Sequence, residues 1–397
     1  MVAAVQYCLS GNRPYPMSDR SSPGDWATEI SSEEYFRDEQ ARLADNWTFA
    51  GMMWDLPFDN AWFRTTAAGR EIFVQRFADG VRAFENVCAH RFMRLRRADR
   101  GVGPIVCGFH HWRYDADGRA VGIPHCRQNF GKSPGEIDAR LTRLDVATVG
   151  AFIYVRTLEA RDGAERPDLD TWLGPMRAIM IDRFPMDAKA RSATRMVSAN
   201  WKLCWRISLD DYHVVAVHPS TFGRSGYIPK EHIQYHRAHP HSAYFTAPHT
   251  TDLEGAAAAC ADGRYEPRGY RSFYVHLGAT VAEFRTLFLF KYRVFHTLVL
   301  HYAPEAAGQS KLQIWIAPSP HMERGLASRP LRLLALLMTP YVLRRALKIL
   351  EEDHAVCADL QVAAGQARGA PIYGEQETRV RWFDDAYRRG AAEADQR

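Results

Sequence analysis

Alternating apolar and polar positions predict short β-strands in the first half of the chain. Residues 70–77 (REIFVQRF) and 80–88 (GVRAFENVC) follow this period, and Asp79-Gly80 between them favours a hairpin turn. A second hairpin is indicated by Asp117-Gly118, and residues 150–157 (GAFIYVRT) predict the last strand of the same module. The pattern therefore predicts a small, mostly β module that ends near residue 160.

Helices are predicted near both ends of the chain. Residues 1–30 are rich in Ser, Pro, Gly and Asp and predict an arm. Residues 31–47 predict a helix, because Ser31 or Ser32 can cap its start and acidic residues occupy its first turn. A long helix is predicted at residues 341–361.

The second half of the chain combines strands with helices. Residues 287–295 (LFLFKYRVF) and 310–318 (SKLQIWIAP) each predict a strong strand. The polar, turn-rich run at residues 160–170 separates this part from the β module. We therefore expect an α+β protein in three parts: an N-terminal arm and helix at residues 1–45, a small all-β domain at 46–160 and a larger domain at 161–397.

Length, charge and cysteine content favour a soluble cytoplasmic protein. The 397 residues suit two domains, and a net charge of +5 is too mild to indicate nucleic-acid binding. The seven cysteines are scattered and odd in number, which fits a reducing compartment. No signal peptide is expected, because the first residues lack a sustained apolar run. The longest apolar run, at residues 333–338, is too short to cross a membrane.

Two Cys/His pairs predict a metal centre. Cys88 and His90 lie in the run CAHRF, and Cys107 and His110 lie in CGFHHW; each pair lies beside a turn, so the two loops can converge. Structural zinc is one interpretation, but zinc spacings usually pair Cys with Cys and His with His. One Cys and one His from each loop favour a Rieske [2Fe–2S] cluster, in which two thiolates hold one iron and two imidazoles hold the other.

The residues after the second pair resemble Rieske oxygenases. The run HHWRYDADGRAVGIP is similar to HGWxYDxxGxxxxIP, which follows the second Cys/His pair in that family. Phe92 stands where the family usually has Gly, and His111 replaces the Gly after the second histidine. Neither departure removes a ligand, so both Cys/His pairs are expected to hold the cluster.

A second metal site is predicted in the run NWKLCWRISLDDYHVVAVHP at residues 200–219. His213 and His218 are five residues apart, and Asp210 is three residues before His213, which predicts that Asp210 and His213 share a helix face. Pro219 favours a helix end at His218, with its ring turned back toward His213. Two histidines and one carboxylate form the facial triad of non-haem Fe(II) oxygenases, which leaves positions open for O2 and substrate.

The third iron ligand is predicted by resemblance. Residues 350–361 (LEEDHAVCADLQ) are similar to EDxxxCExxQ, found near the C-terminus of Rieske oxygenase α subunits. This likeness puts Asp353 at the ligand position. Glu351 and Glu352 are the nearest alternatives.

From about residue 35 to about residue 388, the chain resembles the α subunit of Rieske non-haem iron aromatic-ring-hydroxylating oxygenases, a dioxygenase family. The resemblance implies a helix-grip, START-like catalytic domain, with an antiparallel sheet flanked by helices. It also implies a homotrimer, with or without a small β subunit. Asp210 would then bridge His110 of one chain and His213 of the next, with Asp211 as the alternative.

Two further residues depart from the family pattern beside the predicted iron site. The family often has Glu-Asn between NWK and the bridging aspartate, where this chain has Arg206 and Ile207. Ile207 would remove a polar group from near the iron. The predicted ligands themselves are intact.

The resemblance implies the oxygenase component of a multicomponent system. It would use O2 and NAD(P)H-derived electrons, delivered by a reductase with or without a ferredoxin, to hydroxylate an aromatic or heteroaromatic compound in aromatic hydrocarbon catabolism. The alternative is a monooxygenase that removes a methyl group from a quaternary amine or an aryl methyl ether. A pure electron carrier or a structural zinc protein belongs to another class, and the predicted iron ligands argue against both.

Two other runs carry possible binding residues. The basic run at residues 90–100 indicates a solvated face or a docking patch for an acidic ferredoxin or reductase. Five histidines at positions 232, 236, 239, 241 and 249 have irregular spacing, and we expect them mostly in a loop that could touch substrate, and not in a metal site.

Overall fold

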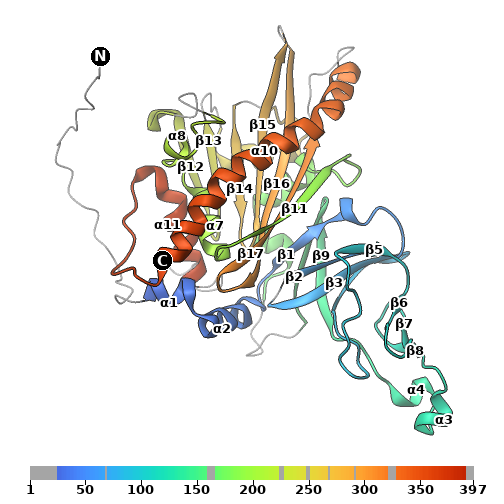
Figure 1. Cartoon of the computed structure of the whole chain (residues 1–397). Helices are drawn as coiled ribbons and strands as arrows, with labels where there is room; N and C mark the ends of the chain where they lie inside the picture. Colours follow the sequence, from blue (N-terminus) through green and yellow to red (C-terminus); the bar gives the residue numbers. More distant parts are fainter. Residues whose placement is uncertain are drawn as a thin grey trace.

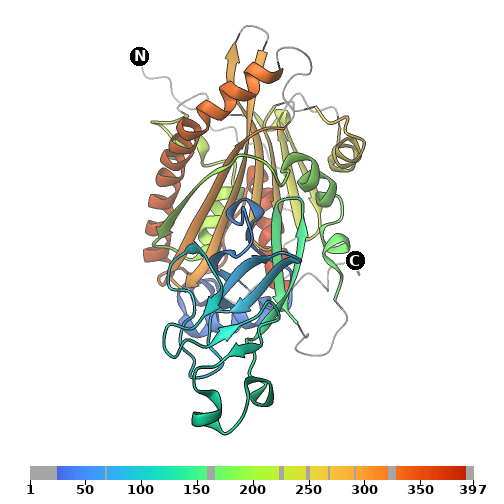
Figure 2. The same ribbon diagram turned by 90° about the vertical axis from the view of Figure 1, so that its right-hand side faces the viewer.

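The computed structural model describes the chain in eight segments: residues 25–67, 69–158, 166–222, 228–246, 251–266, 269–289, 292–320 and 328–389. Two seven-stranded antiparallel sheets and one three-stranded sheet, combined with helices, form an α+β fold, as predicted (Figures 1 and 2). Most of the predicted arm and most of the boundary run lie outside the described residues. The three-part division of the chain therefore stays a prediction.

The first seven-stranded sheet is the predicted β module. In spatial order its strands are β1 (Thr48–Met52), β10 (Phe152–Thr157), β9 (Arg143–Val149), β4 (Gly80–Glu85), β3 (Arg70–Phe77), β2 (Ala61–Ala67) and β5 (Arg100–Val102). The smaller sheet contains β6 (Ile105–Val106), β7 (Arg113–Tyr114) and β8 (Ala120–Gly122). The two predicted Asp-Gly turns lie between β3 and β4 and between β7 and β8. One Cys/His pair follows β4, and the other lies between β6 and β7.

The second seven-stranded sheet forms the centre of the larger part. Its strands, in spatial order, are β11 (Arg191–Val197), β17 (Gln309–Pro318), β16 (Tyr292–Ala306), β15 (Ala279–Leu289), β14 (Arg271–Val275), β13 (His241–Thr246) and β12 (Ile233–Ala238). The strand predicted at 310–318 is confirmed as β17. The single strand predicted at 287–295 is wrong, because β15 and β16 form a hairpin there with Leu289 opposite Tyr292. No Gly, Pro, Asn or Asp marks that turn in the sequence.

Helices cover both faces of the second sheet. On one face, α7 (Trp201–Leu209), α10 (Ser328–Ala364) and α11 (Thr378–Arg389) pack in one apolar cluster, and Figure 1 shows α10 crossing that face. The other face packs against α5 (Leu169–Leu173), α6 (Met176–Arg183), α9 (Leu253–Ala261) and the first sheet. The remaining short helices are α3 (Cys126–Phe130), α4 (Pro134–Ile137), α8 (Val214–Val217), η1 (Met53–Asp55), η3 (Lys230–His232) and η4 (Glu375–Glu377). This is the expected sheet flanked by helices.

Two predicted helices differ from the observed ones in their limits. The helix predicted at 31–47 is two helices, α1 (Asp25–Ser31) and α2 (Glu33–Leu43), and Ser32 caps the second by accepting from Tyr35 N–H at 3.2 Å. The helix predicted at 341–361 begins at Ser328, so Pro340 lies inside it. Packing of Leu331 and its neighbours continues the helix on the N-terminal side of the proline. Within the described residues, no helix is both long and apolar enough to span a membrane.

Candidate metal centres

Two loops of similar shape carry the Cys/His pairs. Phe92 N–H donates to Cys88 O at 3.0 Å in the loop after β4, and His111 N–H donates to Cys107 O at 3.0 Å in the loop after β6. Phe92 has a φ of +60° and His111 a φ of +58°, in the left-handed region that favours glycine. The two departures from the family pattern therefore keep the loop shape, at a cost of about 1–3 kcal/mol each.

The loops bring two thiols and two imidazoles together. Cys88 and Cys107 are buried, whereas His90 and His110 are half-buried. The two imidazole rings lie 4.7 Å apart between centroids, and Trp112 stacks on His90 at 4.5 Å with parallel planes. The sulfur donors are thus inside, and the nitrogen donors remain partly accessible.

This donor set fits a [2Fe–2S] cluster. Burial raises the pKa of the Cys88 thiol, and the neighbouring Cys107 raises it further, although Tyr114 opposes the shift through its hydroxyl, 3.0 Å from Cys88 Sγ. Two adjacent buried thiolates need a bound cation to hold them at neutral pH. His110 Nδ1 is also buried and has no hydrogen-bond partner among the described residues. A cluster would satisfy both requirements.

Asp210 and His213 do not share a helix, contrary to the prediction from their spacing. Asp210 ends α7 in an extended conformation, and its Oδ1 accepts from Tyr212 N–H at 2.6 Å, so the chain turns before α8 begins. The turn still brings Asp210 Oδ2 to 3.3 Å from His213 Nδ1. Burial raises the pKa of the alternative residue, Asp211, to about 7, and its N–H donates to Gln376 O at 3.2 Å.

The two histidines that flank α8 and one carboxylate of α10 converge on one site. His218 caps the C-terminal end of α8, as Pro219 predicted. Potential ligand atoms of His213, His218 and Asp353 all lie within 4.8 Å of one another. Asp353 Oδ1 lies 3.3 Å from His213 Nε2 and 3.1 Å from His218 Nε2, and it is buried without a hydrogen-bond partner among the described residues. Two imidazole nitrogens and one carboxylate oxygen this close together fit a facial triad around iron.

Glu352 contacts a triad histidine from behind and is not itself part of the triad. Its Oε2 lies 2.8 Å from His218 Nδ1, the ring nitrogen that faces away from the triad. The hydroxyls of Ser220 and Thr221 also donate to Glu352, and these hydrogen bonds lower its pKa to about 2. Glu352 therefore stays ionised and orients the His218 ring, as carboxylates behind metal-binding histidines do.

Charge within the triad is coupled. Burial lowers the pKa of His213, but Asp210 and Asp353 raise it to about 9 overall. Burial likewise raises the pKa of Asp353, but the two histidines lower it overall. A divalent cation can replace the proton that His213 would otherwise keep, because the same carboxylates stabilise either charge.

The triad opens onto a cavity of about 1440 Å³. Side chains from α7, β12, β13, β15, β16 and α10 line it, and most are apolar or aromatic, among them Phe222, Phe284 and Leu298. Ile207 is one of the lining residues, so this departure from the family pattern does face the site. Arg206 instead points into the core, where it binds Glu29 at 2.6 Å and Asp384 at 2.9 Å.

The described part of the histidine-rich run is mostly strand and not mostly loop, which corrects the prediction. The described histidines of the run, 232, 236, 239 and 241, lie on η3, β12 and β13 and in the turn between these strands, and none lines the cavity. His249 lies outside the described residues. In the basic run, Arg96 is buried and binds Gln75 Oε1 at 2.7 Å, whereas Arg91, Arg94, Arg97 and Arg100 are exposed.

Two family models match the chain. The Rieske [2Fe-2S] domain matches residues 46–148, and the catalytic domain of the ring-hydroxylating α subunit matches residues 175–393. The two Cys/His loops in the β part and the His-His-Asp site in the larger part agree with these two family models. The chain belongs to the family of ring-hydroxylating α subunits that carry a Rieske domain. The cofactors of that family are a [2Fe–2S] cluster and a mononuclear iron.

Curated relatives have different substrates in their names. The oxygenase subunit of glycine betaine monooxygenase from Pseudomonas aeruginosa is 30% identical over 200 residues, 48% of this chain and 42% of the relative. The large oxygenase component of salicylate 5-hydroxylase from Ralstonia sp is 28% identical over 234 residues, 53% of this chain and 54% of the relative. The chain spans about half the length of the curated relatives it matches.

Solved structures share the fold over nearly the whole chain. Naphthalene 1,2-dioxygenase from Rhodococcus sp., bound to indole, has a TM-score of 0.67 at 16% identity and covers 91% of this chain and 92% of its own. A quaternary ammonium Rieske monooxygenase in complex with L-carnitine has a TM-score of 0.62 at 16% identity, with 90% and 92% covered. At such identities the likeness establishes the fold alone.

Proposed function

We propose that the protein is the oxygenase component of a Rieske non-haem iron system that hydroxylates an aromatic or heteroaromatic substrate with O2. The observation that carries this proposal is the His-His-Asp triad at the wall of a large, mostly apolar cavity. When bound, the cluster supplies single electrons and the iron supplies the oxygen-activating chemistry. The apolar walls bind the ring and exclude water from it.

The proposed roles follow the geometry of the two sites. The cluster ligands are Cys88, His90, Cys107 and His110, and the iron ligands are His213, His218 and Asp353. Glu352 keeps His218 oriented through the contact at Nδ1. The three triad residues would hold the metal at the cavity wall, so substrate and O2 would reach it from the cavity.

Asp210 is proposed to connect the two kinds of centre across a subunit interface. In Figure 1, strands β6–β8 and helix α8 lie at opposite ends of the chain, so the cluster loops are far from the triad of the same chain. Asp210 already contacts His213 Nδ1 at 3.3 Å. In a homotrimer its carboxylate would also accept a hydrogen bond from His110 of the partner subunit, which would link the two imidazoles.

The partners of the system are proposals as well. NAD(P)H would provide electrons through a reductase, directly or through a ferredoxin, in the cytoplasm, where the buried free cysteines stay reduced. The exposed arginines of the basic run surround the Cys88 loop and would attract an acidic partner. A small β subunit is compatible with the trimer but is not required by it.

Demethylation is the second candidate function. The glycine betaine and L-carnitine proteins share the family and the fold, respectively, and Ile207 replaces a polar residue at the cavity wall. Both reactions would use the same ligands. They differ in their products, because demethylation releases formaldehyde and ring hydroxylation does not.

The test is turnover with a surrogate reductase, NADH and a panel of aromatic and methylated compounds. We expect O2 consumption coupled to a hydroxylated ring without formaldehyde. If formaldehyde is released in an amount equal to the NADH consumed, the reaction is demethylation and not ring hydroxylation. No coupled O2 consumption with any compound, in protein that holds both metal centres, would contradict the proposed function.

A further inference from the structure

Arg345 is a half-buried cation in the wall of the cavity. It lies on α10, and its Nη2 donates to Thr221 O at 3.0 Å. Among the residues that the structure describes, no carboxylate lies within ion-pair distance of it. A guanidinium carries five N–H donors, so most of the donors of Arg345 remain available to a ligand.

The positive and negative residues of the cavity wall lie at different levels along α10. Asp210, Asp211 and Asp353 line the cavity beside the iron triad, whereas Arg345 lies two turns earlier on α10. Eight residues of helix correspond to about 12 Å along the axis. Because Asp353 belongs to the triad, this length is also the approximate offset of Arg345 from the iron site. The side chain of Arg345 and one ring-sized molecule can together span it.

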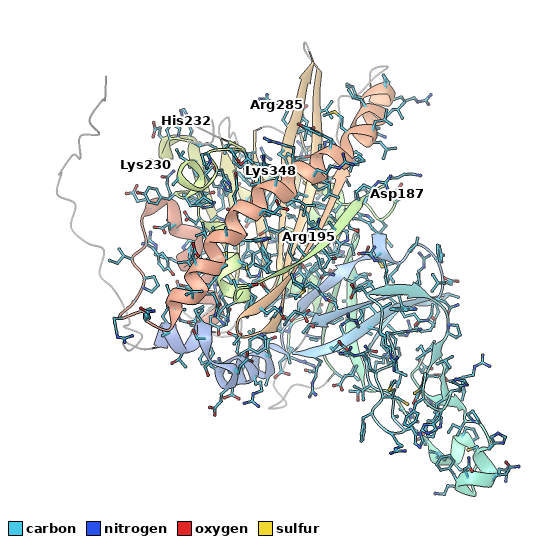
Figure 3. The ribbon with its side chains drawn as sticks, viewed as in Figure 1. Asp187, Arg195, Lys230, His232, Arg285 and Lys348 are labelled. Atoms are coloured by element: carbon cyan, nitrogen blue, oxygen red, sulfur yellow. The ribbon has the colours of Figure 1, made fainter. Side chains whose placement is uncertain are left out.

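Two other charged residues also line the cavity. Arg285 projects from β15, and Figure 3 shows it near the upper end of the sheet, with α10 and Lys348 in front. The second of these two residues is Glu266, which is acidic. Both Arg285 and Glu266 have other interactions, so the inference rests on Arg345.

Most of the other residues that line the cavity are apolar or aromatic. The ring of Phe222 meets the ring of His218 edge to face at 5.3 Å between centroids, and Phe284 and Leu298 line the sheet side. Aromatic and aliphatic walls of this kind suit an apolar ring. The lining thus combines many apolar side chains with a cation that lies two helical turns before the triad residue Asp353 on α10.

We propose that the cavity takes an aromatic carboxylate, with the ring over the triad and the carboxylate on Arg345. The planar fork of an arginine matches a carboxylate with two parallel hydrogen bonds. This inference rests on the proposed function, because it assumes that the ring faces the metal. It goes further in naming the charged group of the substrate and the residue that recognises it.

Binding of benzoate and of its neutral analogue benzamide tests the inference without turnover. Calorimetry on the metal-loaded protein at pH 7.5 should show benzoate binding at least about tenfold more tightly than benzamide. Arg345→Gln should weaken benzoate about 10- to 100-fold and leave benzamide unchanged. Arg345→Lys, which keeps the charge and loses the fork, should fall between the two.

Lys348→Gln is the matched control, because it removes the same charge from an exposed position of the same helix outside the cavity. It should leave both affinities unchanged. Equal affinities for benzoate and benzamide, no binding of either, or an unchanged ratio in Arg345→Gln would overturn the inference. So would Arg345-dependent binding of glycine betaine in place of benzoate. Benzoate binding without any coupled O2 consumption would instead contradict the proposed function and leave the carboxylate site intact.

Discussion

Three consecutive acidic residues of α10 have different surroundings. Each step along a helix rotates the side chain by about 100°, so Glu351 is exposed, Glu352 binds His218 Nδ1, and Asp353 faces the Nε2 atoms of both histidines. Resemblance put Asp353 at the ligand position, but residue spacing alone did not separate the three carboxylates. The structure favours Asp353, and it also reveals Glu352 as an orienting residue, which the sequence did not indicate.

Asp353→Ala should lose the mononuclear iron and keep the cluster. The substitution removes one of three donors and leaves the Cys/His loops, which lie in another part of the chain, untouched. Iron content should fall from three to two per chain, while the red-brown colour persists. Glu351→Ala is the control and should keep three irons; full iron in Asp353→Ala would move the ligand to Glu351 or Glu352.

His241 is a buried histidine that should make stability sensitive to acid. Its Nε2–H donates to Trp172 O at 2.8 Å and its Nδ1 accepts from His276 N–H at 3.1 Å, so the neutral ring satisfies both neighbours. Burial lowers its pKa to about 4, against an unfolded value near 6.5. The unfolded state therefore binds the extra proton first, and the contribution of His241 is present above pH 6.5 and is lost as the pH falls toward 4.

Denaturation of the wild type should accordingly become easier between pH 6.5 and 5. In His241→Gln, the dependence of the unfolding free energy on pH should be flatter by about 1.4 kcal/mol per pH unit. His125→Gln changes an exposed histidine and should keep the wild-type slope. An identical slope in both variants would mean that His241 titrates normally in the folded protein.

At the scale of elements, α7 is held in place by buried charge. Asn200 caps the helix by accepting from Lys202 N–H at 3.0 Å. Lys202 forms a fully buried ion pair with Glu39 of α2, and Trp201 Nε1–H donates to the other oxygen of Glu39 at 2.9 Å. The helix that leads to Asp210 is therefore anchored to the N-terminal helices.

Lys202→Met should destabilise the protein strongly, because it leaves Glu39 buried without its cation. The expected loss is about 3–5 kcal/mol, visible as a fall of several degrees in the midpoint of thermal unfolding. The double variant with Glu39→Leu should recover part of the loss. Arg237→Met is the control, because it breaks an exposed pair with Asp385 and should cost below about 1 kcal/mol. If Lys202→Met and Arg237→Met lower the stability equally, burial of the Lys202–Glu39 pair does not explain the effect.

Elements with clear local signals were predictable from the sequence. The Asp-Gly hairpins, β17 and the Ser32 cap all follow from residues within a few positions. The hairpin of β15 and β16 lacks turn residues, and α10 continues through Pro340, because tertiary packing outweighs the local preference in both places. Glu39, the partner of Lys202, is 163 positions away in the sequence, so a local pattern does not reveal the pair. The position of Arg345 in the cavity wall likewise depends on how α10 crosses the sheet, which no local pattern shows.

For the whole molecule, the separation of the two sites predicts complementation between chains. Cys107→Ser should lose the cluster and keep the iron site, and Asp353→Ala should do the reverse, so each variant alone should be inactive. Co-expression should restore part of the coupled O2 consumption, because in the proposed trimer the cluster of one chain would serve the iron of its neighbour. Adding Asp210→Ala to the Cys107→Ser chain should abolish the rescue while both metals remain. Rescue that survives Asp210→Ala would refute its bridging role.

The presence of two different iron centres in one chain is the central claim. An EPR spectrum of the anaerobically purified, dithionite-reduced protein, with iron and zinc counted on the same sample, tests it most directly. We predict a Rieske signal together with three irons per chain and no stoichiometric zinc. Zinc at the Cys/His loops without a Rieske signal would contradict the account, and the proposed oxygenase function would then have no electron source.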